Sequence, residues 1–558
     1  NTAIGHDALC ATTTGGQNNA FGDGAMNTNT IGCRNIAMGS SALFSNTEGL
    51  CNTALGHIAM YDNSTGDTNT AVGSSALENN TTASSNTAVG HNSLCVNTTG
   101  AENTAVGIAT LRINTTGTRN VAVGYLALTS NTTAAGNIAV GESALENNST
   151  GASNTAIGRK SLINNTTASN NTAVGFCTLT VQSTNGTHNT AVGANALRLN
   201  TTGTHNVAVG FAALDGNTEA VGNVAIGHAA LNATTTGAAN TAVGRQSMDA
   251  NTTGACNTAV GNNSLGANTT GCQNIAIGTE AMKFGTTGDF NTAVGVLTLG
   301  GSDVSTGNDN TAIGRKSMFD NTSGTNNTAV GNNSLGNNTT GASNVAVGNS
   351  AMFDNTSGNN NVGVGCDALG NNTTANNNTA VGCGALHKNT TGTTNTAVGH
   401  RASACNTTGD SLSAFGMCAL STNTTGGNNT AVGYFSSKCN TTGADNTAVG
   451  WGSLCANTTG NSNVTIGKDA GKLIDDGDGN VIVGGLGADN LTTGCYNTYV
   501  GSETSSSAVD ILFESVIGRS GTGKGSGTFF SASSANGVFN TANATAWSQT
   551  SDRRIKKN

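Results

Sequence analysis

Hydrophobic and polar residues alternate in a pattern that repeats every 17 residues along most of the chain. The segment Asn-Thr-Ala-Val-Gly at residues 69–73 returns nearly unchanged in this step. The register gives 31 repeats over residues 1–518, with one extra residue before Asn189 and two before Asn310. We number the slots of each repeat from one to seventeen, starting at this Asn. Self-similarity at a short fixed period is the signature of a stacked repeat architecture.

The apolar residues occupy fixed slots. Slot five is Gly in all 31 repeats, slot four is a large apolar residue, and slot nine is Leu or Met in the first 23. Alternation at slots two to four predicts a short strand, with slots two and four on one face and the small Ala of slot three on the other. We expect slots four and nine to line the interior, and slot three to pack against a neighbouring chain. We further expect a second short strand at slots eight and nine.

These patterns predict an all-β fold, a parallel β-solenoid or β-roll of 31 coils that forms an elongated fibre. The Asn-Thr-Thr-Gly segment in slots twelve to fifteen is typical of a turn. Asn and Thr should stack at the corners, where stacked amides bond along the axis. One coil cannot bury enough apolar surface to fold alone, so neighbouring coils must stabilise one another. We divide the chain into a repeat shaft (1–518), a Gly/Ser-rich linker (519–550) and a short tail (551–558).

Composition narrows the function classes. The net charge of −9 and a charged fraction of 9% argue against nucleic-acid binding. No run of 18 apolar residues occurs, so no membrane-spanning helix is expected. The chain begins at Asn1, already in register, which suggests a processed chain or a fragment.

The 14 cysteines follow the repeat. Four pairs fall at similar slots of adjacent repeats, where disulfide geometry is within reach: Cys33–Cys51, Cys256–Cys272, Cys366–Cys383 and Cys439–Cys455. We predict that these pairs form coil-to-coil disulfides, with Cys405 and Cys418 as a weaker fifth pair. Disulfides would place the protein in an oxidising, extracellular setting. The alternative is that the cysteines are scattered over turns and stay reduced.

Three further motifs suggest ligands, and each has a plainer interpretation. Asp475, Asp476 and Asp478 form the densest acidic turn; they could hold calcium, although a solvated turn is the favoured interpretation. Residues 518–524 resemble the start of a phosphate-binding loop, but Gly525 follows where Ser or Thr is needed. Histidines recur in slot six and are interpreted as surface residues rather than metal ligands: His6, His57, His91, His228 and His400. We expect no cofactor.

Asn-x-Ser/Thr sequons are dense, for example at Asn80 and Asn97. They permit N-glycosylation in a eukaryotic secretory pathway. We favour a structural interpretation, in which the slot-twelve Asn forms a buried ladder and carries no sugar, because the repeat itself demands Asn there.

The last eight residues, Ser-Asp-Arg-Arg-Ile-Lys-Lys-Asn, resemble the start of the self-cleaving intramolecular chaperone domain of phage tailspikes, endosialidases and tail fibres. The resemblance implies that Ser551 is the nucleophile, Lys556 its base, and the Ser551–Asp552 bond the one that is cut. The rest of that domain is absent after Asn558, so we do not expect this chain to cleave itself or to act as an enzyme.

The repeat also resembles the head repeats of trimeric autotransporter adhesins, whose Asn-Ser-Val-Ala-Ile-Gly motif is similar to residues 463–467, Asn-Val-Thr-Ile-Gly. This resemblance implies left-handed coils, although the period of 17 leaves handedness open. Both resemblances imply homotrimers.

The expected function is therefore a structural fibre shaft on a virion or cell-surface appendage, in contact with other copies of itself and with a host surface. Two alternatives stay open. An adhesin would bind a glycan or matrix protein and should carry rows of exposed aromatic residues, which the sequence does not reveal. A glycan-coated filament would grow by end-to-end stacking.

Overall fold

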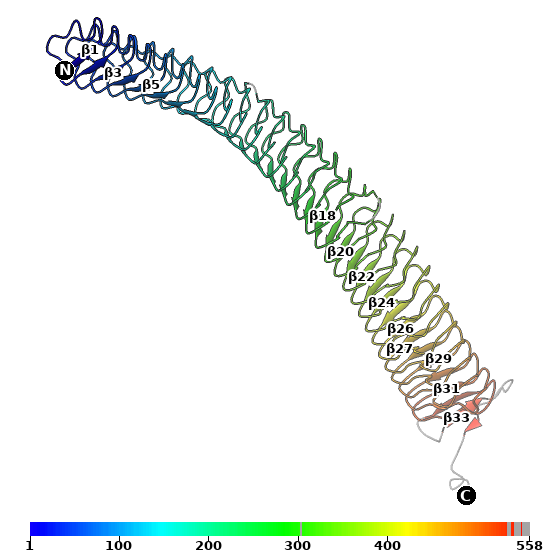
Figure 1. Ribbon diagram of the computed structural model, residues 1–558. Coiled ribbons are helices and arrows are strands. Elements are labelled where there is room, and N and C mark those ends of the chain that lie inside the picture. The colour runs from blue at the N-terminus through cyan, green and yellow to red at the C-terminus, as the bar shows by residue number, and fades with distance from the viewer. Residues whose placement is uncertain (183, 302–303, 533–536, 541–547, 550–558) are drawn as a thin grey trace, which may run out of the picture. The chain divides into compact units, whose positions relative to one another are not determined.

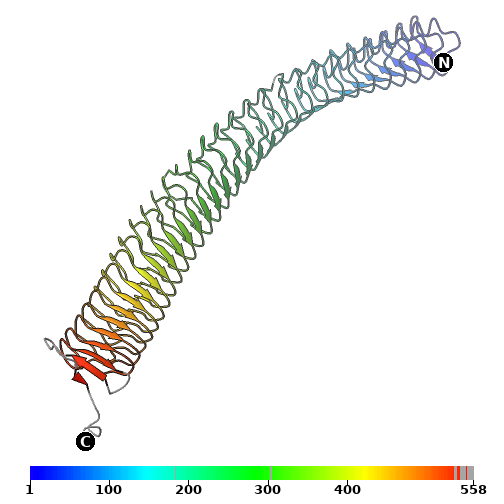
Figure 2. The ribbon, with the colours of Figure 1, turned by 180° about the vertical axis from the view of Figure 1, so that it is seen from behind.

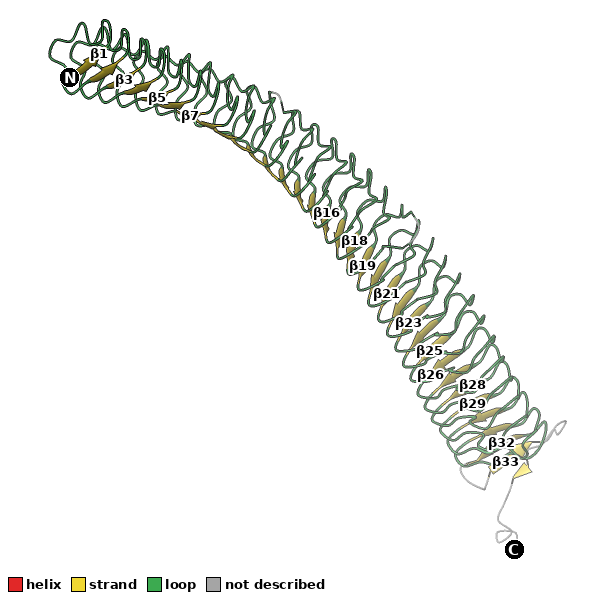
Figure 3. Ribbon diagram, in the orientation of Figure 1, coloured by secondary structure: helices red, strands yellow, loops and turns green. Residues whose placement is uncertain are grey.

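The computed structural model describes residues 1–182, 184–301, 304–532, 537–540 and 548–549. The regular elements of these residues are strands, without a helix, and they fall into two compact units, 1–280 and 281–558. In each unit the strands lie one beside the next and loops complete every coil (Figures 1 and 3). The view from behind shows the same order of strands in each unit (Figure 2). The predicted all-β parallel solenoid of about 31 coils is confirmed.

Unit 1 contains 17 strands of three residues, one for each coil that begins in it. The strands are β1 (Thr2–Ile4), β2 (Asn19–Phe21), β3 (Ile36–Met38), β4 (Thr53–Leu55), β5 (Thr70–Val72), β6 (Thr87–Val89), β7 (Thr104–Val106), β8 (Val121–Val123), β9 (Ile138–Val140), β10 (Thr155–Ile157), β11 (Thr172–Val174), β12 (Thr190–Val192), β13 (Val207–Val209), β14 (Val224–Ile226), β15 (Thr241–Val243), β16 (Thr258–Val260) and β17 (Ile275–Ile277). Neighbouring strands pair in parallel and in register, so Ala156 lies beside Ala173. The extra residue before Asn189 leaves this register intact, because Ala173 pairs with Ala191.

Unit 2 continues the pattern in 14 coils and ends in a different arrangement. Its strands are β18 (Thr292–Val294), β19 (Thr311–Ile313), β20 (Thr328–Val330), β21 (Val345–Val347), β22 (Val362–Val364), β23 (Thr379–Val381), β24 (Thr396–Val398), β25 (Ser413–Phe415), β26 (Thr430–Val432), β27 (Thr447–Val449), β28 (Val464–Ile466), β29 (Val481–Val483), β30 (Thr498–Val500), β31 (Ser515–Ile517), β32 (Phe529–Ala532), β33 (Gly537–Asn540) and β34 (Ser548–Gln549). β32 pairs in parallel with β31, whereas β33 and β34 pair antiparallel. The segment that we expected to be a linker thus contributes three strands.

The strand alternates as predicted, but its two faces are the reverse of the prediction. Slot three is inside: Ala122 and Ala259 are fully buried. Slot four faces outwards, and Val260 is 36% exposed. The interior of a 17-residue coil is narrow, and the slot-nine side chain fills it. At Gly363, which occupies slot three, an added Cβ would lie 2.9 Å from Cγ of Met352, the slot-nine residue of the preceding coil. Only a small side chain fits slot three opposite Leu or Met.

Slots eight and nine do not form the second strand that we expected. They lie in a turn, in which slots seven and nine both have left-handed backbone, as at Ala109 (φ 56°) and Leu111 (φ 48°). The slot-nine side chain still points inwards, and Leu111 is fully buried, as predicted. β-branched residues are strongly disfavoured at positive φ. This explains why slot nine holds Leu or Met, whereas slot four holds Val or Ile.

Candidate functional site

The most regular polar feature is a ladder of buried amides at slot twelve. Asn97 donates from Nδ2 to Oδ1 of Asn80 in the preceding coil (2.8 Å) and to the carbonyl of Gly100 in its own turn (2.9 Å). Both Asn side chains are fully buried. The predicted buried Asn ladder at slot twelve is confirmed, and the absence of sugar stays a prediction. A sugar on Nδ2 would replace one of these two donors inside the folded coil.

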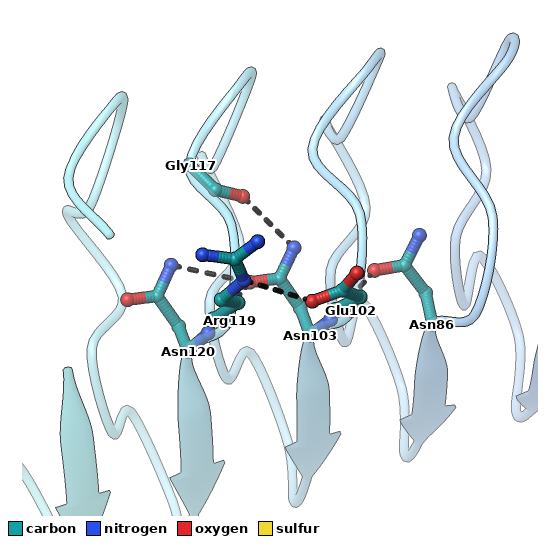
Figure 4. A network of polar contacts seen from close by, with 6 residues as sticks. All are labelled: Asn86, Glu102, Asn103, Gly117, Arg119 and Asn120. Carbon is teal, nitrogen blue, oxygen red and sulfur yellow. Dashed lines mark hydrogen bonds and ion pairs between the residues drawn. The ribbon is translucent and has the colours of Figure 1, made fainter. Parts of the chain in front are cut away.

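A second ladder runs along slot one, immediately before each strand (Figure 4). Asn103 donates from Nδ2 to the carbonyl of Gly117 (2.9 Å), and its backbone N–H donates to Oδ1 of Asn86 (2.9 Å). The backbone N–H of Asn120 in turn donates to Oδ1 of Asn103 (3.0 Å). Asn103 therefore closes its own coil and bonds the next one, and most slot-one Asn residues, such as Asn137, repeat both contacts.

Exposed ion pairs lie outside these ladders. In the same view, Nε of Arg119 contacts Oε2 of Glu102 at 2.9 Å (Figure 4). Both side chains are more than half exposed, so the pair adds little to stability. The coil-to-coil connection therefore depends on the buried amides and the strand backbones.

The slot-one ladder ends at Glu514. This residue is fully buried and accepts hydrogen bonds from the Tyr499 hydroxyl (2.8 Å) and the Gly525 N–H (2.9 Å). Burial, followed by the Glu514 charge, raises the pKa of Tyr499 well above its ordinary value. A side chain at Gly523 would overlap the Glu514 carboxyl group. The Gly-rich segment that resembled a phosphate-binding loop thus surrounds a carboxylate of the chain itself.

No disulfide joins the 14 cysteines, all of which lie in the part of the chain that the structure describes. Members of predicted pairs do lie on neighbouring coils. The Cys51 N–H donates to the Cys33 carbonyl (3.0 Å), and the Cys439 N–H donates to the Cys455 carbonyl (3.1 Å). Burial, with the neighbouring Cys439, raises the pKa of the Cys455 thiol. The bridges are absent from the structure, and their formation under oxidising conditions stays a prediction.

The acidic turn does not gather its carboxylates around one point. Asp475 accepts from the Thr458 hydroxyl (2.6 Å), Asp478 accepts from the Asn461 N–H (2.6 Å), and Asp476 is exposed. Each bonded carboxylate therefore connects its coil to the preceding one. Within the described ranges, no three His, Cys, Asp or Glu side chains lie close enough to hold a metal ion.

The slot-six histidines are all exposed, as interpreted from the sequence. The same column also contains an aromatic pair that sequence reasoning missed. Tyr434 and Trp451 are 38% and 46% exposed, and their rings stack with centroids 6.2 Å apart. The Phe435 ring, whose centroid is 3.9 Å from that of Tyr434, helps to line a cavity of about 310 Å³ together with Arg401 and Lys438. Residues that are 17 apart occupy the same slot of adjacent coils and lie side by side. This spacing in the sequence could have predicted the Tyr434–Trp451 pair.

Ser551 and Lys556, the residues of the predicted self-cleavage junction, lie outside the described residues. Within the described part of the chain, there is no helix that could cross a membrane. Comparison of the sequence with protein-family models and curated proteins, and of the fold with solved structures, yields no match.

Proposed function

We propose that this chain is the shaft of an extracellular fibre, such as a virus or phage tail fibre or a similar surface appendage. Its role is mechanical: it holds a fixed distance and presents what lies at its ends. The observation that carries the proposal is the pair of Asn ladders, which run beside in-register strands through most coils and are interrupted at a few, such as Leu412 in slot one and Ile474 in slot twelve. These bonds use the recurring polar side chains to join coil to coil, which suits a stack that must resist mechanical force.

The two resemblances support an extracellular homotrimer with left-handed coils. The tail-fibre resemblance also gives the Ser551–Asp552 junction a purpose, since a C-terminal chaperone would align three chains before they fold. Such alignment matters because near-identical repeats invite slipped register. The packing of slot-three Ala against another chain does not support the trimer, because Ala122 and its equivalents are buried in their own coils.

A shaft should shorten in proportion to the coils removed. Deleting residues 137–273, which make up eight whole coils, should shorten the particle by about 38 Å at a strand spacing of about 4.8 Å. Electron microscopy of the intact and deleted chains measures this difference. A deletion of similar length that ends in the middle of a repeat should disrupt the strand register, so that no continuous elongated particle forms. Particles that are not elongated, or whose length is unchanged by the first deletion, would contradict the shaft function.

A second candidate is glycan binding at the aromatic pair. Exposed aromatic residues are what the adhesin alternative required, and a cationic group lies at this pair, since Nζ of Lys468 is 5.4 Å from the Trp451 ring centroid. If this surface binds an anionic glycan, Trp451→Ala should weaken binding about tenfold or more, equal to about 1.4 kcal/mol. The control Tyr125→Ala removes an aromatic ring that is 53% exposed in the other unit. A glycan array followed by calorimetry provides the measurement, and an intact protein without glycan affinity would exclude the candidate.

A further inference from the structure

The outward face of the strands forms an uncharged stripe along each unit. We define the sheet stripe as the slot-two and slot-four residues of all 31 coils. None of these residues is charged, although charged residues make up 9% of the whole sequence. They are almost all Thr, Val and Ile, with an occasional Ser, Asn, Leu, Met or Phe. Charged residues occupy other slots, most of them exposed, as at Glu102 and Arg119.

The stripe is exposed to solvent in a single chain. Slot-four side chains such as Ile157, Ile226 and Ile313 are 40%, 40% and 41% exposed. In-register pairing places each of them directly beside its equivalent in the next coil. The exposed apolar groups are therefore contiguous within each unit. A contiguous apolar patch larger than a few hundred Å² is unusual on a monomer and marks an interaction surface.

Strand propensity explains part of this composition but not all of it. β-branched residues suit a strand, so Thr, Val and Ile are expected in slots two and four. An isolated Lys or Glu on a solvated strand costs only about 1 kcal/mol or less, however, and a solvated sheet face commonly carries polar residues. The exclusion of charge from every coil therefore indicates that something covers this face.

We propose that the sheet stripe is the surface on which a second copy of this chain packs, sheet against sheet. The proposal rests on the fibre function, since it names the partner of the shaft, and not on the homotrimer, because a stripe that packs on itself closes with two copies. Two flat sheets stack about 10 Å apart when their facing side chains are apolar. An uncharged stripe is complementary to itself. Every coil of one copy can thus meet an equivalent coil of another copy without burying a charge.

The area is sufficient for a stable contact. A Val or Ile side chain that is about two-fifths exposed presents roughly 50 Å² of apolar surface. Eight slot-four residues in residues 281–558 are at least 36% exposed and offer about 400 Å², and seven in residues 1–280 offer about 350 Å². Their sum approaches the roughly 800 Å² per partner of a standard interface. The slot-two methyl groups add to this area.

The test introduces charge into the stripe of the full chain. The variant Ile157→Lys/Ile226→Lys/Ile313→Lys would bury three ammonium groups on each copy, each at high desolvation cost. We expect the dissociation constant to rise about 100-fold or more, so that the variant sediments as a monomer of 54.9 kDa while the unchanged chain sediments as a multimer. The matched control, Ile108→Lys/Val221→Lys/Val296→Lys, alters aliphatic residues that are 53%, 44% and 47% exposed outside the stripe. This control should retain the multimer.

Two results would overturn the proposal: a monomeric unchanged chain, or a stripe variant that keeps the full multimer mass. A control variant that also dissociates would show that charge anywhere disrupts association, and it would overturn the proposal as well. Circular dichroism confirms that each variant keeps its strands. Electron microscopy of the monomeric variant separates the two proposals, because a shaft of unchanged length leaves the fibre function intact even if the stripe proposal fails.

Discussion

Replacing Ala259 by Asp should unfold the coils on either side of it, whereas the same change at Val260 should leave them folded. Ala259 is fully buried in slot three, and its neighbour in slot four is 36% exposed. A carboxylate at residue 259 would face the apolar interior without a partner, at a cost of about 4 kcal/mol or more. At residue 260 it would point into solvent, and we expect a cost of about 1 kcal/mol or less.

Hydrogen exchange over residues 241–280 measures both effects locally, which suits a repeat protein whose coils can open separately. We expect rapid exchange around Asp at residue 259, and near-normal protection with Asp at residue 260. The opposite ranking would mean that slot four, and not slot three, lines the interior.

Replacing Gly416 by Ala should open the stack at that coil. Gly416 occupies slot five with φ 133°, a backbone conformation that residues with a Cβ rarely adopt. An added Cβ would also lie 2.6 Å from the Gly433 carbonyl oxygen in the next coil. Strain and overlap together should cost about 3 kcal/mol or more, because neither backbone can move without breaking the strand ladder.

The matched control lies in the same coil. Gly427 lacks the positive φ, and its added Cβ would lie 3.4 Å from the nearest atom, the Asp410 carbonyl oxygen. Gly427→Ala should change stability by about 0.5 kcal/mol or less. Denaturant unfolding, together with exchange over residues 395–445, compares the two variants. Equal effects would show that neither backbone strain nor overlap with the next coil makes slot five require Gly.

The repeat alone was enough to predict the stacked coils, the parallel pairing, the inward slot nine and the amide ladder. It did not identify the inward face of the strand, because alternation divides slots two to four into two faces without saying which is buried. Side-chain size favours the larger residues for the interior, and here that criterion selects the wrong face. A 17-residue coil has room for one large layer, and Leu111 and its equivalents fill it.

Side-chain sizes near the end of the sequence nevertheless indicate that slot three is the buried face. Where slot three becomes large, slot nine of the preceding coil becomes small. Gly471 precedes Ile482, and an added Cβ at Gly471 would lie 2.9 Å from Cδ1 of that Ile. Ala488 likewise precedes Tyr499, and both residues are fully buried. Because the slot-nine side chain is small where the slot-three side chain is large, the two must occupy the same interior space.

Other features could not be inferred from slots alone. The turn at slots seven and nine depends on left-handed backbone at ordinary residues, as at Leu111, for which single sequences give little signal. The end of the solenoid depends on a buried Glu514 held by Tyr499, a long-range contact outside the repeat pattern. The stacking of Tyr434 and Trp451 could be predicted only by noting that residues at the same slot of adjacent repeats are neighbours in space.

The most direct test of the account is a distance between two labels eight coils apart. Ile108 and Arg245 occupy slot six of their repeats, are exposed, and lie in one unit. Spin labels attached through non-canonical amino acids, in chains diluted with unlabelled protein, report this distance by pulsed electron resonance. One coil per 17 residues predicts a narrow distribution near 38 Å, at about 4.8 Å per coil. A broad distribution, or a distance well beyond 50 Å, would contradict the claim that each repeat closes one coil against the next.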